Sequence, residues 1–351
     1  MLRIRCSSKD RGEKRPMKKS VKIIIIIASV LVVLGLAFGL WKWLEHSKKM
    51  KPVKVHQLTE ADFPEGTPYC PSQMMSYVIE TDDGSLVVID GGNPGDADYL
   101  LEYLQELGGE NPVVEAWIIT HAHNDHYGAL DTLLETGREP QIDALYLNFP
   151  DEEFQKANFP ETTIQYTAQF MKRVEDNKLP LKTAEIGSEL LIDNVAFKFI
   201  YMASDKITYN RPNNGSVVIR MEACGQSVLF TGDLGAEASF EMVKKVDEEL
   251  IQADIVQMSH HGQSGANRLF YKTVNPKACL WPTPEWLWNN DFGEGFDTHI
   301  FTTVETRMWM DKIGVKHHVV SKDGTQVITL PVDFDEPWGI EDCLPDNYRK
   351  Q

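Results

Sequence analysis

Hydrophobic and polar residues follow two different periods along most of the chain, and the period separates predicted strands from predicted helices. Short apolar runs, either continuous or with every second residue apolar, predict strands, because successive side chains of a strand point to opposite faces. The strands expected on this basis cover residues 76–80, 85–90, 113–119, 144–148, 189–192, 195–201, 216–223, 227–230, 254–258, 279–281, 317–320 and 326–330.

Apolar residues spaced three and four apart predict amphipathic helices elsewhere. These helices are expected over residues 98–107, 127–135, 163–174, 236–252, 267–274 and 303–312. Asp-Gly turns inside 81–84 and 322–324 predict two hairpins, one early and one at the end of the domain. Hairpins followed by strands that alternate with helices indicate an α/β (α+β) class, with stacked sheets flanked by helices in one domain. The more polar residues 150–185 are expected to form an insertion or lid.

The first fifty residues have a different character. An uncharged run of 19 residues, 23–41, follows a basic segment and reaches roughly 28 Å as a helix, close to the thickness of a bilayer's hydrocarbon. The sequence therefore predicts a basic cytoplasmic tail over 1–22, a transmembrane signal-anchor over 23–45, a linker over 46–70 and an exported domain over 71–351. A cleaved signal peptide is the alternative, and it exports the domain as well.

Charge is divided unevenly between the two parts of the chain. The 351 residues carry a formal net charge of −17, of which residues 1–51 contribute +10 and the remainder −27. A basic excess before the apolar run favours a single-pass protein of the cell membrane, with the larger part outside the cytoplasm. The acidic part repels polyanions and has no basic stripe, which disfavours nucleic acid as a partner without excluding it.

Three histidines and an aspartate stand within six residues, directly after the predicted strand 113–119: His121, His123, Asp125 and His126. His121 and His123 are two residues apart, so an extended chain directs both to one side, where they can hold one cation. Asp125 and His126 follow the bend and can reach a second cation. Imidazole and carboxylate ligands suit zinc, with manganese or iron as alternatives.

This motif resembles the signature of the metallo-β-lactamase superfamily, and further motifs extend the resemblance to about residues 70–330. Residues 88–92 resemble its Asp-Gly turn, 229–233 its later strand with a metal-bridging Asp, and 259–262 its last His motif. Residues 213–216 narrow the resemblance to the hydrolase domain of ComEC/Rec2-type DNA-uptake proteins and its stand-alone relatives. The resemblance implies the αββα sandwich of that superfamily, here preceded by one N-terminal transmembrane helix.

The resemblance also implies ligands for two divalent metal ions. These are His121, His123, Asp125, His126, Asp233, His260 and His261. The first two would hold one metal, Asp233 would bridge, and the others would hold the second metal, with only one of the two adjacent histidines as a ligand. The remaining histidine would contact the leaving group or substrate, or only hydrogen-bond beside the site. The expected catalytic residues are Asp125, His260 and His261.

Other polar residues are expected near this centre. Asp90 is expected to orient a ligand histidine, with a plain turn residue as the alternative. Substrate contact, or else turn and surface chemistry, is expected of Asn213, Asn214, Ser216 and His299. One departure from the superfamily is plain: no histidine occurs between His126 and His260, where members usually supply a third ligand to the first metal. Water, Asn214 or a later residue would then complete that site.

Metal chemistry leads to the expected function. Two cations about 3.5–4 Å apart would share a hydroxide and polarise the scissile bond. The sequence thus predicts a membrane-anchored, extracytoplasmic metal-dependent hydrolase, and the resemblance favours phosphodiester bonds. The acidic charge keeps open a small phosphoester, carboxylic ester, lactone or amide as substrate. A non-catalytic binding protein with a degraded metal site is the third interpretation, supported by the missing histidine.

Overall fold

Two mixed β-sheets form the centre of the unit formed by residues 49–351. The structure is a computed structural model, and it describes residues 19–49, 51–61, 73–340, 343–345 and 348. Residues 1–48 form a separate unit, and the helix α1 (Lys19–Lys49) occupies most of it. Within the part of the chain that is described, no helix has the length and apolar character needed to cross a bilayer. The predicted tail up to residue 18 and residues 62–70 of the predicted linker lie outside the described residues.

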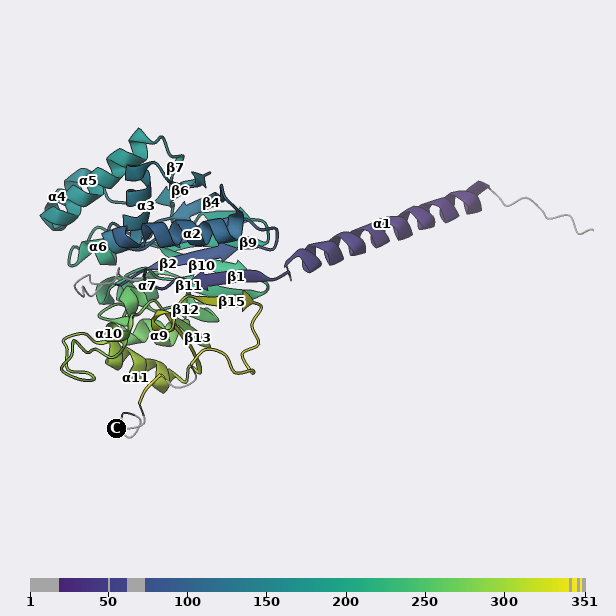
Figure 1. The fold of residues 1–351 in the computed structure, drawn as a ribbon. Coiled ribbons are helices and arrows are strands. Elements are labelled where there is room, and N and C mark those ends of the chain that lie inside the picture. The colour runs from purple at the N-terminus through teal and green to yellow at the C-terminus, as the bar shows by residue number, and fades with distance from the viewer. Residues whose placement is uncertain (1–18, 50, 62–72, 341–342, 346–347, 349–351) are drawn as a thin grey trace, which may run out of the picture. The chain divides into compact units, whose positions relative to one another are not determined.

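The first sheet combines strands from the N-terminal half of the domain with the last strand of the chain (Figure 1). Its strands are β1 (Val53–Gln57), β2 (Ser76–Glu80), β3 (Leu86–Asp90), β4 (Val113–Ile118), β5 (Gln141–Ile142), β6 (Leu145–Leu147), β7 (Leu181–Thr183) and β15 (Gln326–Leu330). Their order is β15-β1-β2-β3-β4-β6-β7, with β5 paired to β4. The predicted early hairpin is confirmed, since β2 and β3 pair antiparallel with Val78 opposite Val88.

The second sheet follows the chain without interruption. Its strands are β8 (Glu189–Ile192), β9 (Val195–Tyr201), β10 (Val218–Ala223), β11 (Gln226–Phe230), β12 (Ile255–Gln257), β13 (Ala278–Trp281) and β14 (His317–Val320). The order β14-β13-β12-β11-β10-β9-β8 reverses the sequence order. Strands β8 to β11 pair antiparallel, whereas β11 to β14 pair parallel, as crossovers through helices require.

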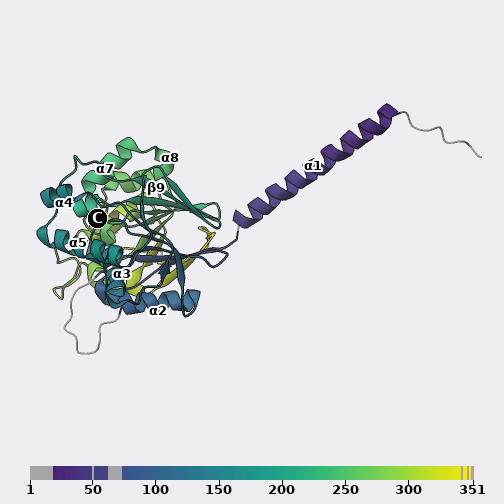
Figure 2. The ribbon, with the colours of Figure 1, turned by 90° about the horizontal axis from the view of Figure 1, so that it is seen from above.

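Helices cover the outer face of each sheet, so four layers result, as the sequence predicts (Figure 2). On the first sheet lie α2 (Ala97–Gly108), α3 (Asn124–Thr136) and α5 (Glu161–Asp176); on the second lie α7 (Ala236–Lys245), α8 (Glu248–Ile251), α9 (Arg268–Val274) and α11 (Thr303–Ile313). The helices on each sheet bury one hydrophobic cluster against it. A third hydrophobic cluster fills the space between the two sheets, where the ring of Tyr77 packs edge-on against Phe230 with 5.1 Å between the ring centroids. Shorter helices complete the list: η1 (Pro94–Asp96), α4 (Glu152–Asn158), α6 (Arg211–Asn214), η2 (Ser259–Gly262), α10 (Glu285–Trp288) and η3 (Ser321–Asp323).

The predicted hairpin at the end of the domain is wrong. Strand β14 lies at the edge of the second sheet, whereas β15 crosses to the first sheet and pairs antiparallel with β1, with Val53 opposite Leu330. Ile328 and Leu330 are buried between the sheets, so the apolar alternation of β15 is satisfied there. Periodicity fixes which face of a strand is buried but not which strand it pairs with. The same pairing places β1 inside residues 46–70, where a linker was expected.

Two further predictions also need correction. The helix expected over 236–252 is two helices, because Val246 and Asp247 adopt extended torsions between α7 and α8. Ile251 of α8 is thereby buried in the second sheet's outer cluster. The segment 150–185 is not a separate insertion over its whole length: Phe170 and Val174 of α5 are buried against the first sheet, and β7 extends that sheet.

Candidate metal centre

Loops that follow strands of both sheets bring the predicted ligands to one edge. Strands β3 and β4 are parallel neighbours in the first sheet, and β11 and β12 are parallel neighbours in the second. Because parallel strands end at the same edge, the residues that follow them meet there. Asp90 ends β3, and the segments after β4, β11 and β12 carry the histidines and the other aspartates. The backbone N–H of Val217 donates to Thr120 O at 2.9 Å and joins the two sheets at this edge.

The loop after β4 divides its ligands between two directions. His123 has extended torsions and stands directly before α3, so Asp125 and His126 fall in the first turn of that helix. On the extended side, His121 Nε2 and His123 Nδ1 are 3.1 Å apart. On the helical side, His126 Nε2 lies 4.0 Å from an oxygen of Asp125. A strand-to-helix transition thus presents two pairs of ligands.

The Asp233 carboxylate stands between four imidazoles. Its Oδ1 lies 3.2 Å from His126 Nε2 and 3.8 Å from His261 Nε2. Its Oδ2 lies 3.8 Å from His121 Nε2 and 3.7 Å from His260 Nε2. Each oxygen therefore faces two ring nitrogens, which is the geometry that a carboxylate shared by two cations requires.

Neighbouring groups fix which ring nitrogen of two histidines faces the centre. His126 Nδ1 lies 2.9 Å from Asp90 Oδ2, so it donates its proton there and leaves the Nε2 lone pair free. His261 Nδ1 lies 3.0 Å from the carbonyl of Pro282 and donates to it in the same way, while His261 Nε2 is 3.2 Å from Asp125 Oδ2. Asp90 is itself held by the N–H of Thr120 at 2.8 Å and by its hydroxyl at 2.9 Å. Asp90 thus has the position of a residue that orients a ligand histidine.

The electrostatics of the cluster favour a bound cation. Burial lowers the pKa of His126, but the carboxylates of Asp233, Asp90 and Asp125 outweigh it and raise that pKa well above its ordinary value. Burial alone raises the pKa of Asp233, yet the surrounding imidazoles hold it well below its ordinary value. Burial lowers the pKa of His121 well below its ordinary value, so that ring is neutral and offers a lone pair. Carboxylates together with the neutral imidazole of His121 form a donor set that zinc binds.

Buried polar atoms without hydrogen-bond partners test whether a metal fits. Such atoms include His126 Nε2, His261 Nε2 and Asp233 Oδ1, which face one another across the centre. Their separations are near the value of about 3.4 Å expected for ligands of one tetrahedral zinc ion. The atoms able to bind a metal form two groups that share the carboxylate of Asp233. One group is Asp125, His126, Asp233 and His261. The other group is His121, His123 and Asp233. The residues fit two divalent cations.

His260 differs from its neighbour His261. Its Nε2 lies 3.1 Å from Asn213 Nδ2 and 3.1 Å from Gln263 Nε2, and its ring also has a hydrogen bond with the backbone of Ser264. Both histidines have left-handed backbone torsions, with φ of 52° and 55°. These torsions turn the two side chains to different oxygens of Asp233. Of the two, His261 is therefore the histidine that groups with Asp125 and His126.

The other residues that were predicted to contact the substrate have different roles in the structure. Ser216 Oγ accepts from the N–H of Asp233 at 3.0 Å, so Ser216 fixes that backbone. The Asn214 amide donates to Tyr209 O and accepts from the N–H of Ala238, which ties α6 to α7. Among the contacts of the described residues, none joins His299 to the cluster.

His299 instead packs edge-on against Phe292, with 4.3 Å between ring centroids, and beside Phe301. The sequence did not predict a role in the metal centre for two residues, Thr120 and Gln263. Each adjoins a histidine motif, and only the folded chain shows that its side chain points into the centre.

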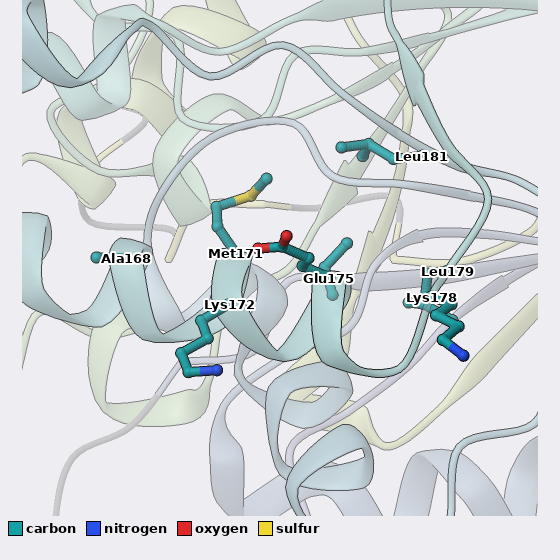
Figure 3. A pocket seen from close by; sticks show the side chains of 8 residues that line it. Ala168, Met171, Lys172, Glu175, Lys178, Leu179 and Leu181 are labelled. Atoms are coloured by element: carbon teal, nitrogen blue, oxygen red, sulfur yellow. The ribbon is translucent and has the colours of Figure 1, made fainter.

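A separate pocket lies between α5 and the start of β7 (Figure 3). It has a volume of about 850 Å³ and is lined by Ala168, Met171, Lys172, Val174, Glu175, Lys178, Leu179 and Leu181. None of these residues belongs to the histidine–aspartate cluster. The chemistry of the chain is therefore concentrated at the edge where the two sheets meet and not in this pocket.

Comparison with known proteins places this cluster in a family. ComE operon protein 3 of Bacillus subtilis (strain 168) is 25% identical over 171 residues, which is 48% of this chain and 20% of that protein. The chain thus spans about a fifth of the length of the curated relative that it matches.

Solved structures with a similar fold include the metallo-beta-lactamase fold protein YhfI from Bacillus subtilis. It is 16% identical, with a TM-score of 0.46, over 79% of this chain and 99% of that one. Zn(2+)-bound PqqB from Methylobacterium extorquens is 12% identical, with a TM-score of 0.45, over 80% of this chain and 100% of that one. The family model of the Metallo-beta-lactamase superfamily matches residues 71–277, which include the predicted ligands from His121 to His261. The chain belongs to the metallo-beta-lactamase superfamily.

Proposed function

We propose that this protein is a metal-dependent hydrolase that works with two divalent cations, zinc foremost. The observation that carries the proposal is the position of Asp233, whose two oxygens each face two imidazole nitrogens in a buried cluster. When bound there, two divalent cations would lower the pKa of water and polarise the scissile bond. Asp90 and the carbonyl of Pro282 hold the tautomers of His126 and His261, so the ligand nitrogens need no rearrangement.

The proposed substrate carries a phosphodiester bond. The motifs shared with ComEC/Rec2-type hydrolase domains and the 25% identity to ComE operon protein 3 support this choice. The formal charge of −27 on residues 52–351 supports a small diester over a long polyanion, because a negative surface repels the phosphates that lie beyond the metal centre. The same charge makes a small phosphoester, or a carboxylic ester, lactone or amide, the second candidate.

One experiment separates these functions. Purified protein is analysed for metal by mass spectrometry and then incubated, with zinc or manganese, with single-stranded DNA, a chromogenic phosphodiester, a phosphomonoester and a lactone. We expect about two metals per chain and diester hydrolysis that Asp125→Ala abolishes, since this change removes a ligand of the second group. A chain without transition metal would support a non-catalytic binding protein. Turnover of the monoester or lactone without diester cleavage would support the second candidate.

We further propose that residues 23–45 anchor the chain in the cell membrane and that the hydrolase domain lies outside the cytoplasm. The uncharged run 23–41 and the basic excess before it support this topology. Cell fractionation, followed by protease treatment of intact cells, tests it. We expect the full chain in the membrane fraction and a domain that external protease degrades. A full-length chain in the soluble fraction would contradict the anchor.

A further inference from the structure

Three polar side chains form a small cluster beside Asp233, on the side of the first ligand group. His260 Nε2 is 3.1 Å from Asn213 Nδ2, 3.1 Å from Gln263 Nε2 and 3.7 Å from Asp233 Oδ2. That same oxygen of Asp233 faces His121, at 3.8 Å. The cluster therefore adjoins the ligands His121 and His123 and not the group around His126.

This cluster contains polar atoms that the fold leaves unused. Asn213 and Gln263 are only 3% and 5% exposed, and the amide nitrogen of each lies 3.1 Å from His260 Nε2. Each primary amide also carries two N–H donors, and at most one of them can point at His260 Nε2. Buried donors are normally paired, so the second N–H of each amide indicates a site for a ligand that accepts hydrogen bonds.

The turn that carries His260 is built for this placement. His260 and His261 both have positive φ, a conformation that residues with a side chain rarely adopt and that is enriched at functional sites. Gly262 follows because a Cβ there would lie 2.6 Å from the ring of Trp281. These unusual torsions direct His260 to one oxygen of Asp233 and His261 to the other.

His260 is placed less well than His261 to be a metal ligand. A ligand histidine almost always donates its second ring nitrogen to a partner, as His261 does to Pro282 O. His260 has a hydrogen bond with the backbone of Ser264, but it is in neither group of atoms close enough to share an ion. The first group therefore supplies only three protein ligands, and a zinc ion with three protein ligands keeps a position open for water or substrate.

We propose that the amides of Asn213 and Gln263, held beside His260, bind a phosphoryl oxygen of the substrate at this open position. The proposal rests on the proposed function, which supplies the metals. The two amides offer N–H donors and none of the three side chains carries a fixed positive charge, so they suit a substrate group with a single negative charge. They neutralise no further charge, which fits an acidic domain that takes one diester and not a polyphosphate.

Binding of inorganic phosphate to the metal-loaded full chain tests this subsite by calorimetry. Gln263→Ala removes one donor, and because hydrogen bonds to a charged group are strong, phosphate affinity is expected to fall about tenfold. Gln263→Glu places a carboxylate beside the anion and is expected to weaken binding further. Gln165→Ala is the matched control, since Gln165 is an exposed glutamine of α5 whose side chain donates only to Glu161. Metal content by mass spectrometry is expected to be unchanged in all three variants.

Metal content also separates the two adjacent histidines. His260→Ala is expected to retain both metals and to weaken phosphate binding, whereas His261→Ala is expected to lose one metal. The subsite is refuted if the metal-loaded wild-type chain does not bind phosphate, if Gln263→Ala binds it as tightly as wild type, or if His260→Ala loses a metal. These failures leave the hydrolase proposal standing, since metal and turnover would persist in the wild-type chain. A wild-type chain that holds no metal would overturn both.

Discussion

Asp90→Asn replaces a single oxygen atom by an NH₂ group, yet it is expected to reverse the tautomer of His126. In the folded chain Asp90 Oδ1 accepts from the N–H of Thr120, and Oδ2 accepts from His126 Nδ1 at 2.9 Å. An amide has one acceptor and one donor end. Whichever way the new amide is turned, its NH₂ group meets a donor, either the fixed N–H of Thr120 or Nδ1–H of His126. The backbone N–H cannot change, so His126 is expected to move its proton to Nε2 and lose its ligand lone pair.

The expected loss follows from how such outer partners act on metal sites. Removing the partner of a ligand histidine costs about tenfold to a hundredfold in metal affinity, which corresponds to about 1.4–2.8 kcal/mol. The loss should fall on the group of Asp125, His126, Asp233 and His261. The other group, which includes His121, has no contact with Asp90 through a ring nitrogen and should keep its affinity.

A chelator-competition titration of the full chain measures both affinities, and urea denaturation of the metal-free form measures folding stability. Asp96→Asn is the matched control, because Asp96 is also buried and accepts from two backbone N–H groups, those of Ala61 and Asn93, at 2.8 Å each. We expect this control to lose folding stability but to keep metal affinity. The reasoning is refuted if Asp90→Asn binds both metals within twofold of wild type, or if Asp96→Asn loses as much metal affinity.

Two further predictions concern stability. Gly128→Ala on α3 places a Cβ 2.4 Å from Pro94 Cδ, so we expect the free energy of unfolding from urea denaturation to fall by about 1–3 kcal/mol. Gly95→Ala is the control: its Cβ would meet nothing within 4 Å, so we expect almost no change in that free energy. Burial raises the pKa of Glu241, but hydrogen bonds from Lys245, Ser204 and Tyr201 outweigh it and lower that pKa to about 2. Its ionised form therefore stabilises the fold above pH 4.5, and this contribution disappears as the pH falls toward 2. Glu241→Gln should lower the urea midpoint at pH 7 and differ less from wild type at pH 3; an equal difference at both values would contradict this.

The sequence alone determined the elements and the chemistry that depends on neighbouring residues. Strands β2, β8 and β9 have the predicted bounds, because a period of two and a bounding turn are local properties. The spacing of His121, His123, Asp125 and His126 is likewise local, since a strand that leads into a helix presents these side chains in two pairs. Pairing beyond the hairpins is not local, and the partner of β15 could not be predicted from its own pattern.

Tertiary structure decided the roles of single atoms. Two adjacent histidines are equivalent in sequence, and only their left-handed torsions and the carbonyl of Pro282 make His261 the one that groups with Asp125. Asn214 and Ser216 belong to one motif, yet their side chains fix α7 and the backbone of Asp233. A ring nitrogen or an amide is assigned its task by partners that are distant in sequence and within about 3 Å in space, and those partners exist only once the two sheets have met.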